Sequence, residues 1–225
     1  MFGGLGRANR GTWHSKVMRV ATDKGRDDVQ PVLRVLPIPG TGHAVTGEAV
    51  PELVRHRLDD LMGTAPRAML LVDFKGARVM TDTLIDILTP LARAVRAARH
   101  GEFLLVVVAS DPGVVQVAEM FAVAQDVPMF VTSSIDEVTR ARPVGKLTPA
   151  ESDSLQWMDR LGGRVTVSGF AKAADLEQTA AGNRLANLSR RGYVQRVPRS
   201  RRDGDEYVTP AYYDGGTAAA QLAAT

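Results

Sequence analysis

The stretch that decides the fold is LEQTAAGNRLANLSRRGYVQRVPRSRRDGDEYV, residues 176–208. Helical spacing of apolar residues predicts a helix over residues 179–191. Its inward side would carry Ala181, Leu185 and Leu188. Gly192 can end the helix in the left-handed conformation, and a basic turn over residues 198–204 precedes a return strand at Tyr207. The stretch therefore predicts a helix followed by a β-hairpin.

A helix is also predicted upstream, because LTPAESDSLQWMDRLGG, residues 147–163, combines a start signal with a stop signal. Thr148 can accept a hydrogen bond from the backbone N–H of Glu151, and the Glu151 carboxylate can accept one from the backbone N–H of Thr148, which makes a capping box. Pro149 occupies the first helical position, where its missing N–H costs nothing. The paired glycines at the end of the stretch are typical of a helix terminus.

The order of elements over residues 147–210 gives the fold class of the C-terminal part. A minimal strand is expected over residues 165–167, and Ser168 is expected to cap a second helix over residues 169–176. Helix, short strand, helix, turn, helix and β-hairpin is the order of an α+β winged helix-turn-helix domain. Residues 211–225 have no core-forming pattern, which predicts a frayed tail.

The outward side of the 179–191 helix indicates contact with double-stranded DNA. With the apolar stripe turned inward, the 100° step per residue turns short polar side chains and arginines outward. Asn can bond adenine, and Arg can bond guanine or phosphate. Residues 184–202 hold seven arginines and no acid, which an ordinary solvated surface would rarely show. The candidate DNA-binding residues are Thr179, Asn183, Arg184, Asn187, Arg190, Arg191, Arg199, Arg201 and Arg202.

The same residues carry a resemblance to a known family. LEQTAAGNRLANLSRRGYVQR, followed by RSRRDGDEYV, resembles the recognition helix and wing of bacterial regulators of the multiple-antibiotic-resistance type. The resemblance covers about residues 147–210. It implies a winged helix that binds duplex DNA, and it carries no information about the ligand or the operator.

Residues 31–142 alternate short apolar runs with amphipathic stretches, which predicts an open α/β sheet with packed helices. The runs expected to form strands are residues 32–38, 68–74, 103–109 and 129–131. The stretches expected to form helices are residues 46–62, 83–99, 114–124 and 134–141. Residues 143–146 break the pattern and are the expected linker, and residues 1–30 are expected to form a flexible basic tail.

A second resemblance lies in this α/β part. Residues 72–77 (VDFKGA) and 80–88 (MTDTLIDIL) are similar to the central strand, loop and helix of STAS and STAS-like domains, which occur in anti-sigma-factor antagonists and sulfate transporters. The similarity covers about residues 32–142. In the phosphorylated antagonists, a target serine stands beside an aspartate at the start of that helix. Here Thr81 and Thr83 stand there without a serine, so they are candidate phosphorylation sites, and a helix cap at Thr81 is the simpler explanation.

The composition excludes several kinds of site. The chain has no cysteine, so it forms neither disulfides nor thiolate metal sites. The four histidines lack ligand spacing, and we expect no metal and no other cofactor. Because no apolar run is long enough to cross a bilayer, we expect no membrane contact and a cytoplasmic, nucleoid-associated location. No nucleophile is paired with a base. Asp73 and Asp86 could pair as catalytic carboxylates, but a strand-end aspartate and an exposed helix aspartate are the commoner explanation, so we expect no enzyme.

These observations lead to the hypothesis of a two-domain transcriptional regulator. The STAS-like domain would receive a signal or a protein partner, and the winged helix would bind DNA as a homodimer. The alternative is a partner-switching adaptor in which the winged helix mediates protein contact. The salt dependence of binding to random duplex separates the two hypotheses, because only phosphate contacts give a steep slope.

Overall fold

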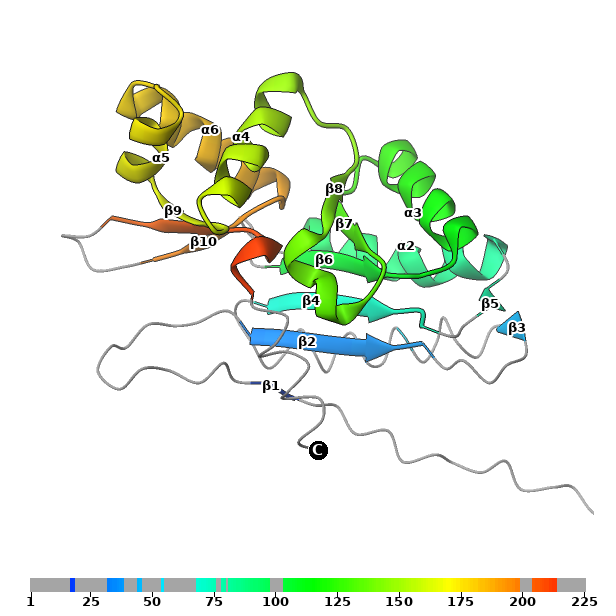
Figure 1. The fold of residues 1–225 in the computed structure, drawn as a ribbon. Helices are drawn as coiled ribbons and strands as arrows, with labels where there is room; N and C mark the ends of the chain where they lie inside the picture. The colour runs from blue at the N-terminus through cyan, green and yellow to red at the C-terminus, as the bar shows by residue number, and fades with distance from the viewer. Residues whose placement is uncertain are drawn as a thin grey trace, which may run out of the picture.

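The structure is a computed structural model of the 225-residue chain. It describes residues 17–18, 32–38, 44–45, 54, 68–75, 78–79, 81–97, 103–198 and 204–213. The fold is mixed α/β, with a mostly parallel six-stranded sheet and a smaller antiparallel sheet near the C-terminus (Figure 1). In the part of the chain that the structure describes, no helix has both the length and the apolar character needed to cross a bilayer.

The large sheet has the strand order β1-β2-β4-β6-β7-β8. Its strands are β1 (Val17–Met18), β2 (Val32–Pro37), β4 (Ala68–Asp73), β6 (Phe103–Val108), β7 (Met129–Thr132) and β8 (Arg142–Val144). The four central strands run parallel, and β1 and β8 pair antiparallel at the edges. Strands β3 (Ala44–Val45) and β5 (Arg78–Val79) form a separate parallel pair. β6 is buried along its whole length, as its continuous apolar run predicts.

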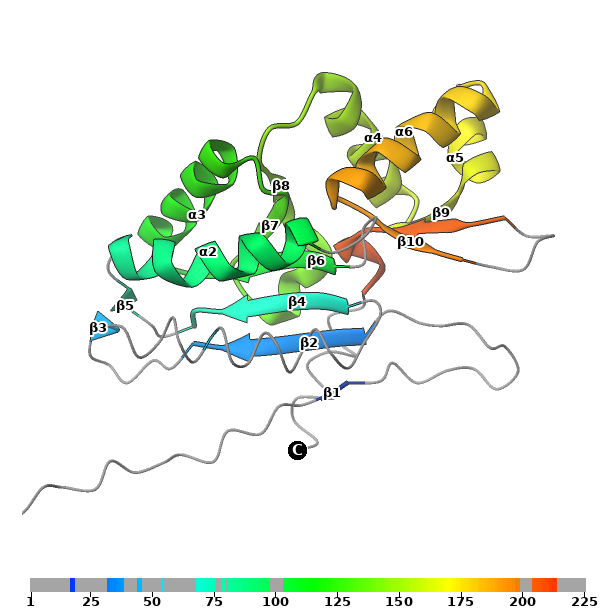
Figure 2. The same ribbon diagram turned by 180° about the vertical axis from the view of Figure 1, so that it is seen from behind.

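Helices α2 (Thr81–Ala97) and α3 (Pro112–Gln125) cover one face of the large sheet (Figure 2). The apolar stripe of α2 packs on alternate side chains of β4 and β6, because successive side chains of a strand point to opposite faces. Asp111 caps α3 by accepting a hydrogen bond from the backbone N–H of Gly113 at 2.7 Å. The helix expected over residues 46–62 lies outside the described residues except for Val54, which is buried in this core.

The C-terminal part follows the predicted order of elements. These elements are α4 (Pro149–Arg160), β9 (Arg164–Thr166), α5 (Val167–Ala173), α6 (Gln178–Arg191), β10 (Gln195–Val197) and β11 (Glu206–Val208). The small sheet has the order β10-β11-β9 and is antiparallel throughout. The predicted capping box of α4 is confirmed, since Glu151 N–H donates to Thr148 Oγ1 at 3.3 Å and Thr148 N–H donates to Glu151 Oε2 at 2.8 Å.

Several expected boundaries are corrected. Ser168 does not cap α5, because the helix already begins at Val167 and Thr166 accepts the N–H of Gly169 at 3.1 Å. Residues 135–140 form the 3₁₀ helix η1 (Ile135–Arg140) instead of an α-helix. The expected linker begins inside β8, where antiparallel pairing with β7 holds residues 143 and 144 in the large sheet.

Both expected tails contain ordered elements. Within residues 1–30, Val17–Met18 forms β1 and pairs with β2. At the other end, residues 210–212 form the 3₁₀ helix η2 (Pro210–Tyr212), and the Tyr213 side chain is only 5% exposed. Tyr213 therefore belongs to the core, and residues 211–213 are not a frayed tail.

A second core joins the other face of the large sheet to the C-terminal part. It contains Met69, Leu71 and Leu104 from the sheet together with Phe170, Leu185 and Tyr193 from the C-terminal part. Two buried hydrogen bonds join the C-terminal part to strands of the large sheet, and a third holds one of the donors in place. Gln195 Nε2 donates to Ala68 O at 2.8 Å, Tyr213 OH donates to Gln195 Oε1 at 2.8 Å, and Tyr193 OH donates to Val144 O at 3.2 Å. The two parts of the chain therefore share this second core.

Candidate nucleic-acid interface

Helix α6 is held against α5 by a tight turn and a buried apolar side. The turn between the two helices, residues 174–177, includes Asp175 in the left-handed conformation with φ 52°. Ala181, Leu185 and Leu188 are fully buried, as the sequence predicted. Gly192, with φ 85°, ends α6 by donating its backbone N–H to the carbonyl of Ser189 at 3.0 Å. These contacts leave the opposite side of α6 facing solvent.

The predicted binding residues differ in exposure along that side. Thr179, Asn183 and Arg190 are exposed, and Arg184, Asn187 and Arg191 are half-buried. Helix α6 carries three arginines and no acidic residue. Helices α5 and α6 lie at the end of the molecule away from β3 and β5 (Figures 1 and 2). The structure thus brings three of the predicted residues together on one open helix side.

Glu151 accepts hydrogen bonds from two of the predicted DNA-binding residues. The sequence did not predict these bonds. Asn187 Nδ2 donates to Glu151 Oε1 at 2.8 Å, and Arg191 NH1 donates to Glu151 Oε2 at 2.5 Å. Arg191 also donates to the carbonyl of Lys146 and pairs with Asp126 of the α3 C-cap at 3.4 Å. Its guanidinium lies 5.4 Å from the ring centre of Tyr193. Asn187 and Arg191 therefore connect α6 to α4 and to the α/β part.

The electrostatics of this cluster favour a charged Glu151. Burial of the carboxyl tends to raise the pKa of Glu151, but the hydrogen bonds from Thr148 and Arg191 outweigh it and hold the pKa below its ordinary value. A carboxyl whose pKa is lower in the folded state stabilises the fold at every pH above its unfolded-state pKa. That stabilisation is lost as the pH falls through the folded-state pKa.

Replacing Glu151 with glutamine should lower the free energy of unfolding at pH 7 by about 1–3 kcal/mol, because the charged Arg191 guanidinium then faces a neutral amide instead of a carboxylate. The difference between wild type and Glu151→Gln should shrink at a pH below the pKa of the carboxyl, where wild type also loses the charge. Urea unfolding at pH 7 and in acid measures both values. Asp153→Asn, an exposed acid on the same helix, serves as the control. A difference that does not change with pH would mean that the charge of Glu151 is unimportant.

The β10–β11 hairpin follows α6 in the chain, and an ion pair joins its two strands near the turn. Arg196 Nε donates to Asp205 Oδ2 at 2.5 Å, and both residues lie beside the turn of the hairpin. Arg164 of β9 donates to Glu206 of β11 at 2.6 Å, which links two neighbouring strands of the small sheet. The predicted phosphate contacts Arg199, Arg201 and Arg202 lie outside the described residues.

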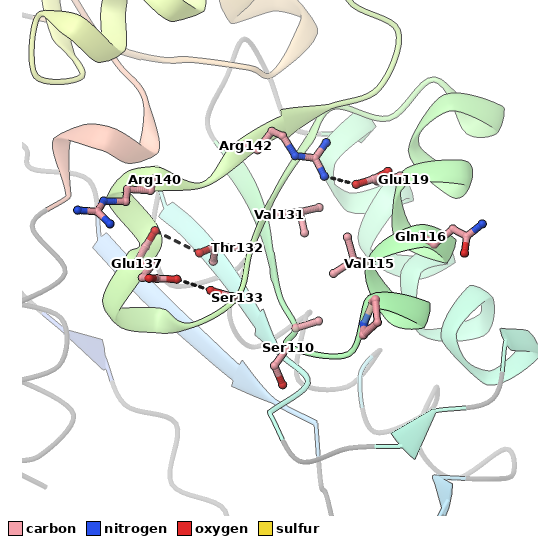
Figure 3. A pocket seen from close by; sticks show the side chains of 12 residues that line it. Ser110, Val115, Gln116, Glu119, Val131, Thr132, Ser133, Glu137, Arg140 and Arg142 are labelled. Carbon is pink, nitrogen blue, oxygen red and sulfur yellow. Dashed lines mark hydrogen bonds and ion pairs between the residues drawn. The ribbon is translucent and has the colours of Figure 1, made fainter.

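A polar pocket of about 590 Å³ lies at the carboxyl ends of β6 and β7, between η1 and the first turn of α3 (Figure 3). Ligands of open α/β sheets bind at these ends of the strands. Within the pocket Arg142 pairs with Glu119, and Ser133 donates to the Glu137 carboxylate. Its charged groups are thus largely paired with one another, and the exposed Arg140 stands at its rim.

The described residues hold no cluster of acidic or histidine side chains that could bind a metal. No protein-family model, curated protein or solved structure matches the chain. Of the two candidate phosphorylation sites, Thr81 is exposed and Thr83 is 8% exposed. Helix α2 begins at Thr81, so this residue lies in the first turn and not at the cap position before it. The exposed side of α6 is therefore the best-defined candidate site.

Proposed function

We propose that the protein is a DNA-binding transcriptional regulator whose C-terminal part is a winged helix-turn-helix. The observation that carries this proposal is the division of α6 into a fully buried apolar side and an open side that presents Thr179, Asn183 and Arg190 without any acid in the helix. A helix of this composition fits the major groove of duplex DNA. The antiparallel β10–β11 hairpin follows α6 in the chain, and in a winged helix such a hairpin contacts the DNA backbone, which supports the proposal.

Asn183 is the residue we assign to base contact. It is exposed on α6, whereas the amide of Asn187, one turn later, is held by Glu151. An amide that already donates to a carboxylate would have to break that bond before it could contact adenine. Asn187 therefore positions α6, and Asn183 contacts bases.

The arginines are assigned to the phosphate backbone. Arg190 is exposed at the C-terminal end of α6, and Arg184 is half-buried on its flank. Arg199, Arg201 and Arg202 would add charge at the tip of the hairpin. Such contacts fix the position of the protein on the duplex without selecting a sequence.

Binding-site selection with affinities measured at several salt concentrations tests these roles. Asn183→Ala should lose about 1–3 kcal/mol at one base position and little on random DNA, whereas Arg190→Ala should weaken all sequences and reduce the salt slope by about one unit. Gln156→Ala, which removes an exposed amide from α4, is the matched control. If the affinity of the wild-type protein for duplex DNA did not depend on salt concentration, the DNA-binding proposal would be contradicted.

One observation favours the second candidate, a partner-switching adaptor. Asp175 and Glu177 are exposed at the N-terminal end of α6, where a phosphate backbone would pass. Their charges repel phosphates and would suit a basic protein surface. A flat salt response with duplex DNA, as in the experiment above, is the outcome that supports the adaptor.

The α/β part is proposed to be a STAS-like receiver that acts in the cytoplasm, beside the nucleoid. The polar pocket at the carboxyl ends of β6 and β7 supports a small polar signal. The exposed Thr81 at the start of α2 would be the more accessible of the two threonines for a kinase. A signal bound in the pocket could reach α6 through η1, because Val138 of η1 belongs to the same core as Leu185 of α6.

A further inference from the structure

Helices α2 and α3 leave an apolar groove between them on their exposed side. The groove has a volume of about 580 Å³, and its apolar lining includes Ile85, Val117 and Met120. Ile85 is 39% exposed and Met120 is 65% exposed. Large apolar side chains grouped at a groove mark interaction surfaces more often than scattered ones do.

The charges of α2 are divided along its length. Asp82 and Asp86 lie in the first half of the helix, Arg93 and Arg96 lie in the second half, and all four are exposed. None of the four forms an ion pair with another residue that the structure describes. Within α2, no acid stands three or four residues from a base, so the charges cannot pair along the helix.

The helix dipole accounts for only half of this arrangement. It favours an acid in the first turn and a base in the last turn, which describes Asp82 and Arg96. The effect falls off within one turn, so it does not require Asp86 or Arg93 to have the charges they have. The charges of Asp86 and Arg93 could pair with charges on another molecule.

A second copy of α2, packed antiparallel, would pair every one of these charges. An axis that passes Thr89 places Asp82 of one copy opposite Arg96 of the other, since each lies seven positions from the axis. Asp86 and Arg93 lie three and four positions from the axis and meet in the same way. A partner with charge of one sign would pair only half of the set and repel the other half.

We infer that the α2–α3 face is a homodimer surface, in which α2 packs antiparallel on α2 of a second copy about a two-fold axis near Thr89. Two-fold interfaces use the same patch on both subunits and must be self-complementary, which the charge order of α2 satisfies. Ile85 and Met120 supply the apolar contact beside the ion pairs. This inference does not depend on the proposed function, because it involves no residue of α6.

Two charge variants and their mixture test the surface in the full-length chain. Arg93→Glu/Arg96→Glu leaves α2 wholly acidic, and Asp82→Lys/Asp86→Lys leaves it wholly basic. Each variant alone should dimerise at least tenfold more weakly than wild type, because like charges then face each other across the axis. An equimolar mixture should form a heterodimer, because every pair is again attractive. Sedimentation velocity gives the dissociation constants, and native mass spectrometry identifies the mixed species.

Lys75→Glu/Arg140→Glu changes the charge equally at two exposed residues away from α2 and should leave dimerisation unchanged. Met120→Ser should weaken the wild-type dimer through the loss of apolar contact without adding a charge, so it tests the surface without altering α2. A wild-type monomer would overturn the inference, as would a dimer insensitive to all of these variants. A mixture in which no heterodimer forms would overturn the antiparallel arrangement. Duplex binding is measured separately, so the failure of one proposal is distinguishable from the failure of the other.

Discussion

Replacing Gly163 with alanine is expected to lower the free energy of unfolding by about 3 kcal/mol or more, because the new methyl group meets backbone and has no room. A Cβ at this position would lie 2.3 Å from the backbone nitrogen of Tyr212 and 2.6 Å from the carbonyl carbon of Ala211. Backbone cannot rotate away as a side chain can. Gly163 is also held in place, since its N–H donates to Met158 O and its carbonyl accepts the N–H of Thr209, both at 2.8 Å.

The neighbouring Gly162 provides the control for this prediction. Gly162 and Gly163 have φ of 80° and 75°, so alanine is disfavoured by backbone conformation at both. Nothing lies within 4 Å of a Cβ at Gly162. Gly162→Ala should therefore cost only about 1–2 kcal/mol, the usual penalty of a left-handed residue. Urea unfolding of both variants gives the comparison, and equal losses would contradict the close approach of η2 to Gly163.

Replacing Tyr213 with alanine should cost about 4 kcal/mol, close to the loss from truncating a buried aromatic residue. The ring lies in the second core, and the hydroxyl donates to Gln195 Oε1 at 2.8 Å. Gln195 has no exposed surface and donates in turn to the Ala68 carbonyl of β4. Loss of Tyr213 thus removes both packing and a member of a buried hydrogen-bond chain.

Tyr213→Phe separates these two contributions. It keeps the ring and removes the hydroxyl, so it should cost about 1–2 kcal/mol through the bond lost to Gln195. Thermal unfolding of wild type and both variants, followed by circular dichroism, measures the series. If Tyr213→Ala changed the stability by only a few tenths of a kcal/mol, residue 213 would behave as the frayed tail that the sequence predicted.

Local signals in the sequence predicted much of the fold. The capping box of Thr148 and Glu151 involves residues three apart, and the continuous apolar run of β6 reports burial on both faces. Each signal arises from the segment that it describes. The buried side of α6 was predictable for the same reason, since helical spacing alone places Leu185 and Leu188 inside.

Long-range contacts were beyond such signals. Glu151 was identified as a cap, but its bonds to Asn187 and Arg191 span 36 and 40 residues of sequence. The same holds for Tyr213, which follows the last apolar pattern and is buried only because Gln195 and the sheet meet it. The cap of α5 was misplaced by two residues, because Thr166 and Ser168 are both good capping residues and β9 decides where the helix can begin.

The shared core also limits which parts of this chain could be exchanged for parts of another protein. A self-contained helical unit can be moved to a new receiver by changing only a connecting segment. Here the hairpin strand β10 is bonded through Gln195 to the Ala68 carbonyl of β4, and Tyr193 is bonded to the Val144 carbonyl of β8. A chimaera that kept residues 147–213 and exchanged the sheet would leave these groups without their acceptors. Such a chimaera is therefore expected to be less stable than the intact chain, because it leaves buried polar groups unpaired.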